Sequence, residues 1–414
     1  MQKKYIIARI KDQKGVTAVI VALLLVVLTG MAALAIDLGH LYVVKNELQN
    51  AADAGALAGA RVLYNNDGTS VNSGANQVAH DAAEANTSEN VAVEVIWNGN
   101  NMTDDAQRGH WQFSTATFTP NNATAPVDLW NASDEELDAN LNFINAVRVT
   151  ARRNNTPATS FFARIFGYNS FQKQASAVAY IGFSGTLVPA DVDQPIAICK
   201  ESITNADGEY DCSIGRMINS GSDDTTNNTG GWTSFSQDNP CQGGTNAQEV
   251  GNLVCAGGNP EMIRLNQSMA TSGGEIQSAF NQLVNCWETE SQGRTRSWNL
   301  TLPVVTCPSN NIGTCEQVVG AVNVDIVWIT GSGEDPGYNN APTQMDGWSN
   351  DNPDGSVRWS DFVAHFQLHN QDGSDAPYAK KSIYFKPSCT PHDPEGISGG
   401  SNFGILARIP VLVQ

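Results

Sequence analysis

The stretch that decides the fold is VTAVIVALLLVVLTGMAALAI, Val16–Ile36, a run of 21 residues without a charged side chain. An α-helix rises 1.5 Å per residue, so the run is about 30 Å long, which matches the hydrocarbon core of a bilayer. The sequence therefore predicts one transmembrane helix at residues 16–36.

The residues before this helix are basic. Residues 1–15 carry a net charge of +4, and the whole chain carries −19, so the remainder carries −23. Basic residues beside a membrane helix stay in the cytoplasm, so we expect residues 1–15 to form a cytoplasmic tip and everything after Asp37 to lie outside. The acidic body repels phosphate groups, which argues against nucleic acid as a partner.

A cleavable signal peptide is the alternative to a membrane anchor. Ala33-Leu34-Ala35 matches the small-x-small cleavage pattern, and the mature chain would then begin at Ile36. The apolar run is longer than a usual signal-peptide core, and helical patterning continues beyond it. Both features favour a retained anchor.

Residues 37–64 contain no proline and are rich in helix formers, which predicts a helical stalk. Small residues recur there every fourth position: Ala51, Gly55 and Gly59 form one series, and Ala52, Ala56 and Ala60 form another. Such a ladder lets another element approach closely. The stalk packs either against the chain's own domain or against a partner helix.

The cysteines all lie within residues 187–414, and none forms a CxxC pair: Cys199, Cys212, Cys241, Cys255, Cys286, Cys307, Cys315 and Cys389. An even number without metal-ligand spacing, behind an export signal, predicts disulfides in an oxidising compartment. Four bridges allow 105 connectivities, and the sequence does not choose among them.

The segment after the stalk alternates between helical and strand patterns. Residues 77–86 and 161–167 predict short helices, the second ending at Gly167. Residues 91–97, 110–118, 145–153 and 171–182 alternate as strands do. These patterns predict a small α+β domain at residues 65–186.

Several motifs follow the anchor in a fixed order: Ala35-Ile36-Asp37-Leu38-Gly39, then LQNAADA at Leu48–Ala54, Gly109-His110-Trp111, Asn145–Thr150, Phe161–Gly167 and Ala175–Ala179. In this order they resemble TadG-like proteins of the Tad/Flp pilus-assembly system, over roughly residues 14–182. The resemblance implies a pilus-assembly or minor pilin-like structural role. It implies the inner membrane and other Tad/Flp components or pilin-like helices as partners, and no enzymatic activity.

Two features depart from related proteins. Prepilin-like subunits carry a glycine before the cleavage point and a glutamate five residues later, whereas Gly15 is followed at that distance by Ile20. The DxSxS metal motif of von Willebrand A-type domains, present in some family members, does not occur in the sequence. Processing as a major pilin is therefore not expected.

One segment has the spacing of a calcium loop. Asn350, Asn352, Asp354 and Asp361 stand at positions 1, 3, 5 and 12, with Gly355 at position 6. The first two are neutral, and aspartate replaces the usual glutamate at position 12. Turns rich in Asx residues beside a glycine also form without metal. Calcium is thus a candidate ligand, and no other cofactor is expected.

Three further patterns suggest chemistry but lack its context. Gly396-Ile397-Ser398-Gly399-Gly400 matches GxSxG without the strand before and the helix after. His365 and His369 match HxxxH without the glutamate of zinc proteases. Trp328, Trp348 and Trp359 suit a glycan site or, more commonly, a core. We therefore do not expect an enzyme.

These patterns together predict an α+β protein. It consists of a transmembrane helix that continues as a stalk, a small α+β domain, and a β-rich, disulfide-containing domain at residues 187–414. The leading hypothesis is a membrane-anchored pilus-assembly protein with its bulk periplasmic or extracellular and with a contribution to adhesion. The alternatives are a tethered binding module for a glycan or surface, with calcium, and a secreted enzyme released after Ala35.

Overall fold

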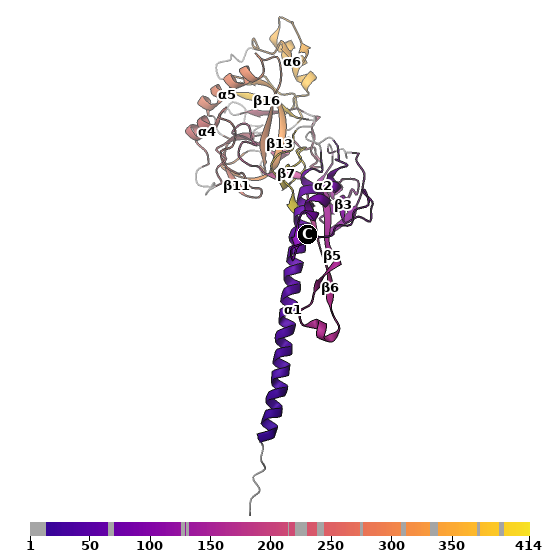
Figure 1. Ribbon diagram of the computed structural model, residues 1–414. Helices are drawn as coiled ribbons and strands as arrows, with labels where there is room; N and C mark the ends of the chain where they lie inside the picture. Colours follow the sequence, from indigo (N-terminus) through magenta and orange to yellow (C-terminus); the bar gives the residue numbers. More distant parts are fainter. Residues whose placement is uncertain are drawn as a thin grey trace, which may run out of the picture.

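The computed structural model describes residues 14–64, 70–125, 129, 132–213, 215–219, 230–237, 244–273, 276–307, 312–331, 338–370, 373–388 and 393–414. The fold is a long N-terminal helix that carries two domains at its C-terminal end (Figure 1). The predicted α+β class with a disulfide-containing C-terminal part is confirmed.

The first helix, α1 (Lys14–Arg61), has 48 residues and no break. At 1.5 Å per residue it is about 72 Å long. It is the candidate membrane span among the described residues, and its most apolar 18-residue window is 0% buried. One face of the second half of α1 is buried, since Val44, Leu48, Ala52 and Ala56 are inaccessible to solvent. One helix therefore provides both the candidate membrane span and a core element of the first domain.

The first domain is an antiparallel five-stranded sheet in the order β18-β6-β5-β3-β4. Its members are β3 (Ala106–Gln112), β4 (Thr117–Pro120), β5 (Ala146–Thr159), β6 (Ser170–Tyr180) and β18 (Val411–Leu412). The stalk half of α1 and α2 (Ala75–Glu84) share a core with β5 and β6. Two two-residue strands, β1 (Thr87–Ser88) and β2 (Val91–Ala92), and α3 (Asp134–Ala139) complete it.

The observed elements differ from the predicted ones at two places. The expected strand at residues 110–118 is a hairpin, because the chain turns between β3 and β4 and Ala116 has a φ of 50°. The expected strand at 91–97 pairs only at β2 and at the Glu94–Arg152 bridge. Strand periodicity alone does not reveal a turn that interrupts it.

The second domain contains a seven-stranded sheet in the order β11-β10-β8-β12-β13-β16-β9. These strands are β8 (Ile196–Cys199), β9 (Arg216–Asn219), β10 (Gly230–Thr233), β11 (Ser268–Ser272), β12 (Trp298–Val305), β13 (Cys315–Thr330) and β16 (Ser382–Pro387). Because β11 also pairs with β13, five of them close into a ring. β8 and β12 are parallel, and the other pairs are antiparallel.

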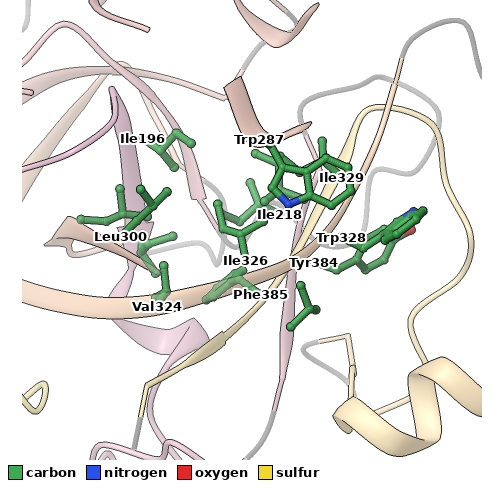
Figure 2. Packing of buried hydrophobic residues seen from close by; sticks show 14 of the residues in the cluster. Ile196, Ile218, Trp287, Leu300, Val324, Ile326, Trp328, Ile329, Tyr384 and Phe385 are labelled. Carbon is green, nitrogen blue, oxygen red and sulfur yellow. The ribbon is translucent and has the colours of Figure 1, made fainter. Parts of the chain in front are cut away.

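Three helices and two short strand pairs accompany this sheet. The helices are α4 (Ala247–Leu253), α5 (Gln277–Glu290) and α6 (Gly355–Phe366), with a 3-10 turn, η2 (Lys200–Ser202). The strand pairs are β14 (Gln344–Met345) with β15 (Trp348–Ser349), and β7 (Phe183–Thr186) with β17 (Ile397–Gly400). Figure 2 shows the core, in which Trp287 and Trp328 meet edge to face at 5.2 Å.

The C-terminal segment returns to the first domain. β18 pairs with β6, and Figure 1 places the C-terminus beside α1. The Asn402 side chain donates to the carbonyl oxygens of Leu129 and Ala132, at 2.7 and 3.0 Å. The proposed division at residue 187 did not anticipate this return, through which the last residues of the chain complete the first sheet.

Candidate functional site at the membrane-proximal junction

At the end of the apolar half of α1, a polar contact is made by Asp37, the residue that follows the apolar run. Its side chain is 5% exposed, and its carboxylate accepts hydrogen bonds from three successive backbone N–H groups. The donors are Phe161 at 2.8 Å, Phe162 at 3.1 Å and Ala163 at 2.6 Å. Asp37 thus fixes the tip of the β5–β6 hairpin against α1.

The tip itself is a short 3-10 helix, η1 (Ala163–Phe166), that ends at Gly167. Gly167 has a φ of 91°, a conformation that glycine adopts without strain. The Phe161 ring lies against the His40 ring, with centroids 4.9 Å apart. The predicted short helix at residues 161–167 is therefore present, and it is bound to α1.

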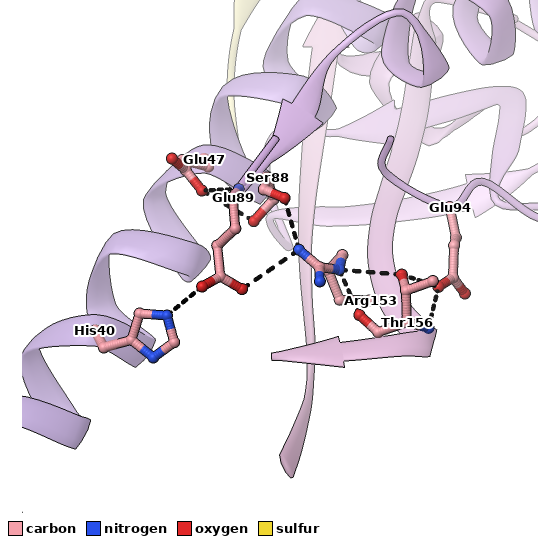
Figure 3. Close-up of polar contacts among 7 residues, drawn as sticks. All are labelled: His40, Glu47, Ser88, Glu89, Glu94, Arg153 and Thr156. Carbon is pink, nitrogen blue, oxygen red and sulfur yellow. Dashed lines mark hydrogen bonds and ion pairs between the residues drawn. The ribbon is translucent and has the colours of Figure 1, made fainter. Parts of the chain in front are cut away.

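A polar network continues the junction along α1 (Figure 3). His40 contacts Glu89, and the Glu47 carboxylate accepts hydrogen bonds from the backbone N–H of Glu89 and the hydroxyl of Ser88. Arg153 of β5, which is buried, pairs with Glu89 at 3.5 Å and donates to the Ser88 carbonyl at 2.6 Å. The network joins α1, the β1–β2 turn and the hairpin.

The small residues of the stalk lie inside the same domain. Ala51, Ala52, Ala56, Gly55 and Gly59 are all buried. A Cβ at Gly55 would lie 2.7 Å from the Ala79 carbonyl oxygen, and one at Gly59 would lie 2.6 Å from the Ala79 Cβ. The structure therefore places this ladder against α2 and β5, as in the first of the two interpretations above.

The cysteines of the second domain form disulfides. Cys199 is bonded to Cys307, and Cys255 to Cys286. Cys212 and Cys315 are disulfide-bonded as well. Cys241 and Cys389 lie outside the described residues. The one cluster of metal-ligating side chains found among the described residues, Cys199, Glu201 and Cys307, contains the first disulfide, so its sulfurs are already in use.

The proposed calcium loop forms a series of turns that leads into α6. Asn350 accepts a hydrogen bond from the backbone N–H of Asn352, Asn352 from that of Asp354, and Asp354 from that of Ser356, each at 2.9 Å. Asn350 also donates its amide to Asp361 at 2.5 Å. Asp354 is the N-cap of α6. A bound ion would compete with these hydrogen bonds, and the calcium site stays a prediction.

The catalytic patterns have structural roles in the described part of the chain. The Ser398 hydroxyl is buried, accepts from the N–H of Gly182 and donates to the Ile409 carbonyl. His365 lies in α6, whereas His369 follows the left-handed Gln367 that ends it, so the two do not share a helix face. Trp328 and Trp359 are 4% exposed core residues. The partly buried Trp348 packs on Phe362.

The sequence analysis missed the role of Asp37. Its one signal was an acidic residue directly behind the apolar run, in the first of the ordered motifs, Ala35-Ile36-Asp37-Leu38-Gly39. Asp37 and Phe161 are 124 residues apart, so no local pattern could join them. The pairing depends on the length and register of the β5–β6 hairpin.

Comparison with known proteins gives two family matches. Residues 15–62 match the Flp pilus-assembly TadE/G-like model, and residues 58–179 match the Tad-like Flp pilus-assembly model. No curated protein and no solved structure matches the chain. The two matched ranges cover α1, the hairpin and nearly all of the first domain, which are the parts that build the junction. Over residues 15–179 the chain is therefore similar to Flp pilus-assembly proteins, to the TadE/G-like model over α1 and to the Tad-like model over most of the first domain.

Proposed function

We propose that this chain is a single-pass inner-membrane component of the Tad/Flp pilus-assembly machinery, with everything after Asp37 on the extracytoplasmic side. The observation that carries the proposal is the family match over the helix and the domain that it enters. The basic residues before the span support this orientation. The disulfides support an oxidising compartment for the body.

The geometry suggests a structural contribution rather than a chemical one. Because the second half of α1 lies in the core of the first domain, the body is held firmly on the membrane span. A pilus component that binds the body would thereby be held at a set distance from the bilayer. The Tad pilus-assembly family is structural and non-enzymatic.

Deletion of the gene in its host tests the role in assembly. We expect surface pili to be lost and to return when the full-length chain is supplied in trans. The matched control is the same chain with Gly39→Ala, because a Cβ at Gly39 meets nothing within 4 Å. Unaltered pilus numbers in the deletion strain would contradict the proposal. Surface attachment of the same strains tests the contribution to adhesion.

Anchoring and orientation are tested separately. We expect the native chain to fractionate with the inner membrane and to keep its residues before Val16. Protease added to spheroplasts should digest the body. An N-terminus at Ile36 in a soluble fraction would instead support release after Ala35, the lowest-ranked hypothesis.

The binding-module alternative remains open to a direct measurement. Calorimetric titration of the full chain with calcium and with glycans would detect it. Retention of binding in Asn350→Ala together with Asp361→Ala would exclude the proposed calcium loop as the site. Of the three tryptophans considered for a glycan site, Trp328 and Trp359 are core residues, which weakens this alternative.

A further inference from the structure

The tip of the β5–β6 hairpin exposes an unusual amount of apolar surface. Residues 160–169 read SFFARIFGYN and contain one charge, Arg164. Five large apolar or aromatic side chains are exposed there: Phe161, Phe162, Ile165, Phe166 and Tyr168. Ile165 and Phe166 are 76% and 78% exposed. Exposed apolar patches of this kind mark sites of contact with another phase or molecule.

The tip presents these side chains in a fixed arrangement. Its backbone is held by the three hydrogen bonds to Asp37, and the Tyr168 N–H donates to the Ala163 carbonyl at 3.2 Å. The Ser160 N–H donates to the Asn169 carbonyl at 3.0 Å and closes the base of the turn. Hydrogen bonds therefore hold the backbone of the tip in place, while its apolar side chains stay exposed.

The position of the tip indicates what covers it. Asp37 directly follows Ile36, the last residue of the apolar run, and the described side chains from Thr17 to Ile36 are exposed or, at Ala33, partly exposed. If that run of about 30 Å spans the hydrocarbon core, Asp37 lies at its boundary, and so does the tip bound to it. Figure 1 shows the hairpin running along α1 and ending in η1 near the middle of the helix.

We propose that the turn between β5 and β6 is a second membrane contact. Its aromatic and aliphatic side chains insert into the boundary between headgroups and hydrocarbon, on the face of the bilayer that carries the body. Aromatic side chains favour this depth, and an arginine there can reach lipid phosphates. A lipid surface fits better than a protein partner because the patch continues the apolar surface of α1 laterally.

This contact would limit tilting of the body. If α1 were the only contact, the body could tilt in any direction relative to the bilayer. A second contact at the hairpin tip, beside α1, would restrict tilting in the plane that contains both contacts. The Asp37 carboxylate positions the tip, since it binds three of the tip's backbone N–H groups.

The inference rests on the proposal that α1 spans the bilayer, and the test separates the two. The full chain is reconstituted into vesicles of phosphatidylethanolamine and phosphatidylglycerol. It carries the photo-crosslinking residue p-benzoylphenylalanine at one of three exposed positions. These are Leu28 in the apolar run, Phe166 in the tip and, as the matched control, Phe113, which is 53% exposed near the end of β3.

We expect lipid adducts from positions 28 and 166 and none from position 113. Adducts at 28 but not at 166, or adducts at 166 to a second protein chain only, would overturn the membrane contact and leave the anchor intact. Absence of lipid adducts at 28 would overturn the anchor, and the tip contact with it.

Discussion

Two glycines of α1 illustrate how single residues set the packing of the first domain. Gly55 and Gly59 stand where α1 meets α2 and β5, and each lacks room for a methyl group. Glycine within a helix costs roughly 0.5–1 kcal/mol relative to alanine. The close approach of α2 is what makes glycine favourable at these positions.

Substitution of either glycine should destabilise the domain. Gly59→Ala would place its Cβ 2.6 Å from the Ala79 Cβ and 3.0 Å from Val147. Overpacking costs about 1–3 kcal/mol, more than the helix propensity gained. We expect a lower midpoint of denaturant unfolding for the detergent-solubilised chain. Gly39→Ala, in the same helix but in open space, should leave the midpoint unchanged or raise it, and an equal response of the two variants would refute the packing argument.

At the scale of the element, the β5–β6 hairpin has a register shift between Arg153 and Ala158. Glu94 supports this irregular segment. Its carboxylate accepts from the N–H groups of Asn155 and Thr156, at 2.9 and 2.8 Å, and from the Thr156 hydroxyl. One carboxylate thus satisfies donors that the irregular register leaves without strand partners.

These hydrogen bonds make the hairpin sensitive to acid. Partial burial of Glu94 alone would raise its pKa, but the donors from Asn155, Thr156 and Asn154 outweigh it and lower the pKa below the ordinary 4.5. A lowered folded-state pKa gives stability that is present above about pH 4.5 and is lost as the pH falls through the folded value. Unfolding midpoints measured from pH 6 downwards, at roughly unit steps, should therefore fall more steeply for the natural chain than for Glu94→Gln.

The control for this titration is Glu290→Gln, at the exposed end of α5. The unfolding midpoint of this variant should match that of the natural chain at each pH measured. If Glu94→Gln also follows the natural chain, then the Glu94 carboxylate does not stabilise the hairpin, and the irregular register is held by its other contacts.

At the scale of the whole molecule, the second half of α1 and the C-terminal strand β18 belong to the same domain. The Val413 N–H donates to the Val178 carbonyl, and the Val178 N–H donates to the Gln414 carbonyl, both at 2.9 Å. Val411 and Val413 pack beside Trp111 and Tyr180. The second domain is thus inserted between strands of the first, and both of its ends are tied to the five-stranded sheet.

Removal of residues 411–414 should weaken the first domain and spare the second. The lost strand hydrogen bonds and valine contacts amount to about 2 kcal/mol, and the edge of β6 becomes unpaired. We expect faster proteolysis of the hairpin, while the second domain, whose seven-stranded sheet lacks β18, stays protected. Leu412→Ser is the control, because it keeps the strand backbone and changes a half-exposed side chain. Its hairpin should be digested at the same rate as that of the natural chain.

The sequence by itself determined the apolar span, the continuation of α1 as a stalk, the α+β class and the disulfide-bonded nature of the second domain. These properties follow from composition and local periodicity, which neighbouring residues express without help from the rest of the chain. Residues 145–153 were predicted as a strand for the same reason, and all of them after Asn145 lie in β5.

Only the tertiary structure decided which elements meet. Asp37 binds the hairpin tip across 124 residues, the small residues of α1 face α2 and β5, and the last strand returns to β6. Such pairings depend on strand register and on the length of the intervening chain, which periodicity does not encode. The same reason explains why the segment Phe161–Gly167 was predicted as a helix but not as a surface held beside the membrane span.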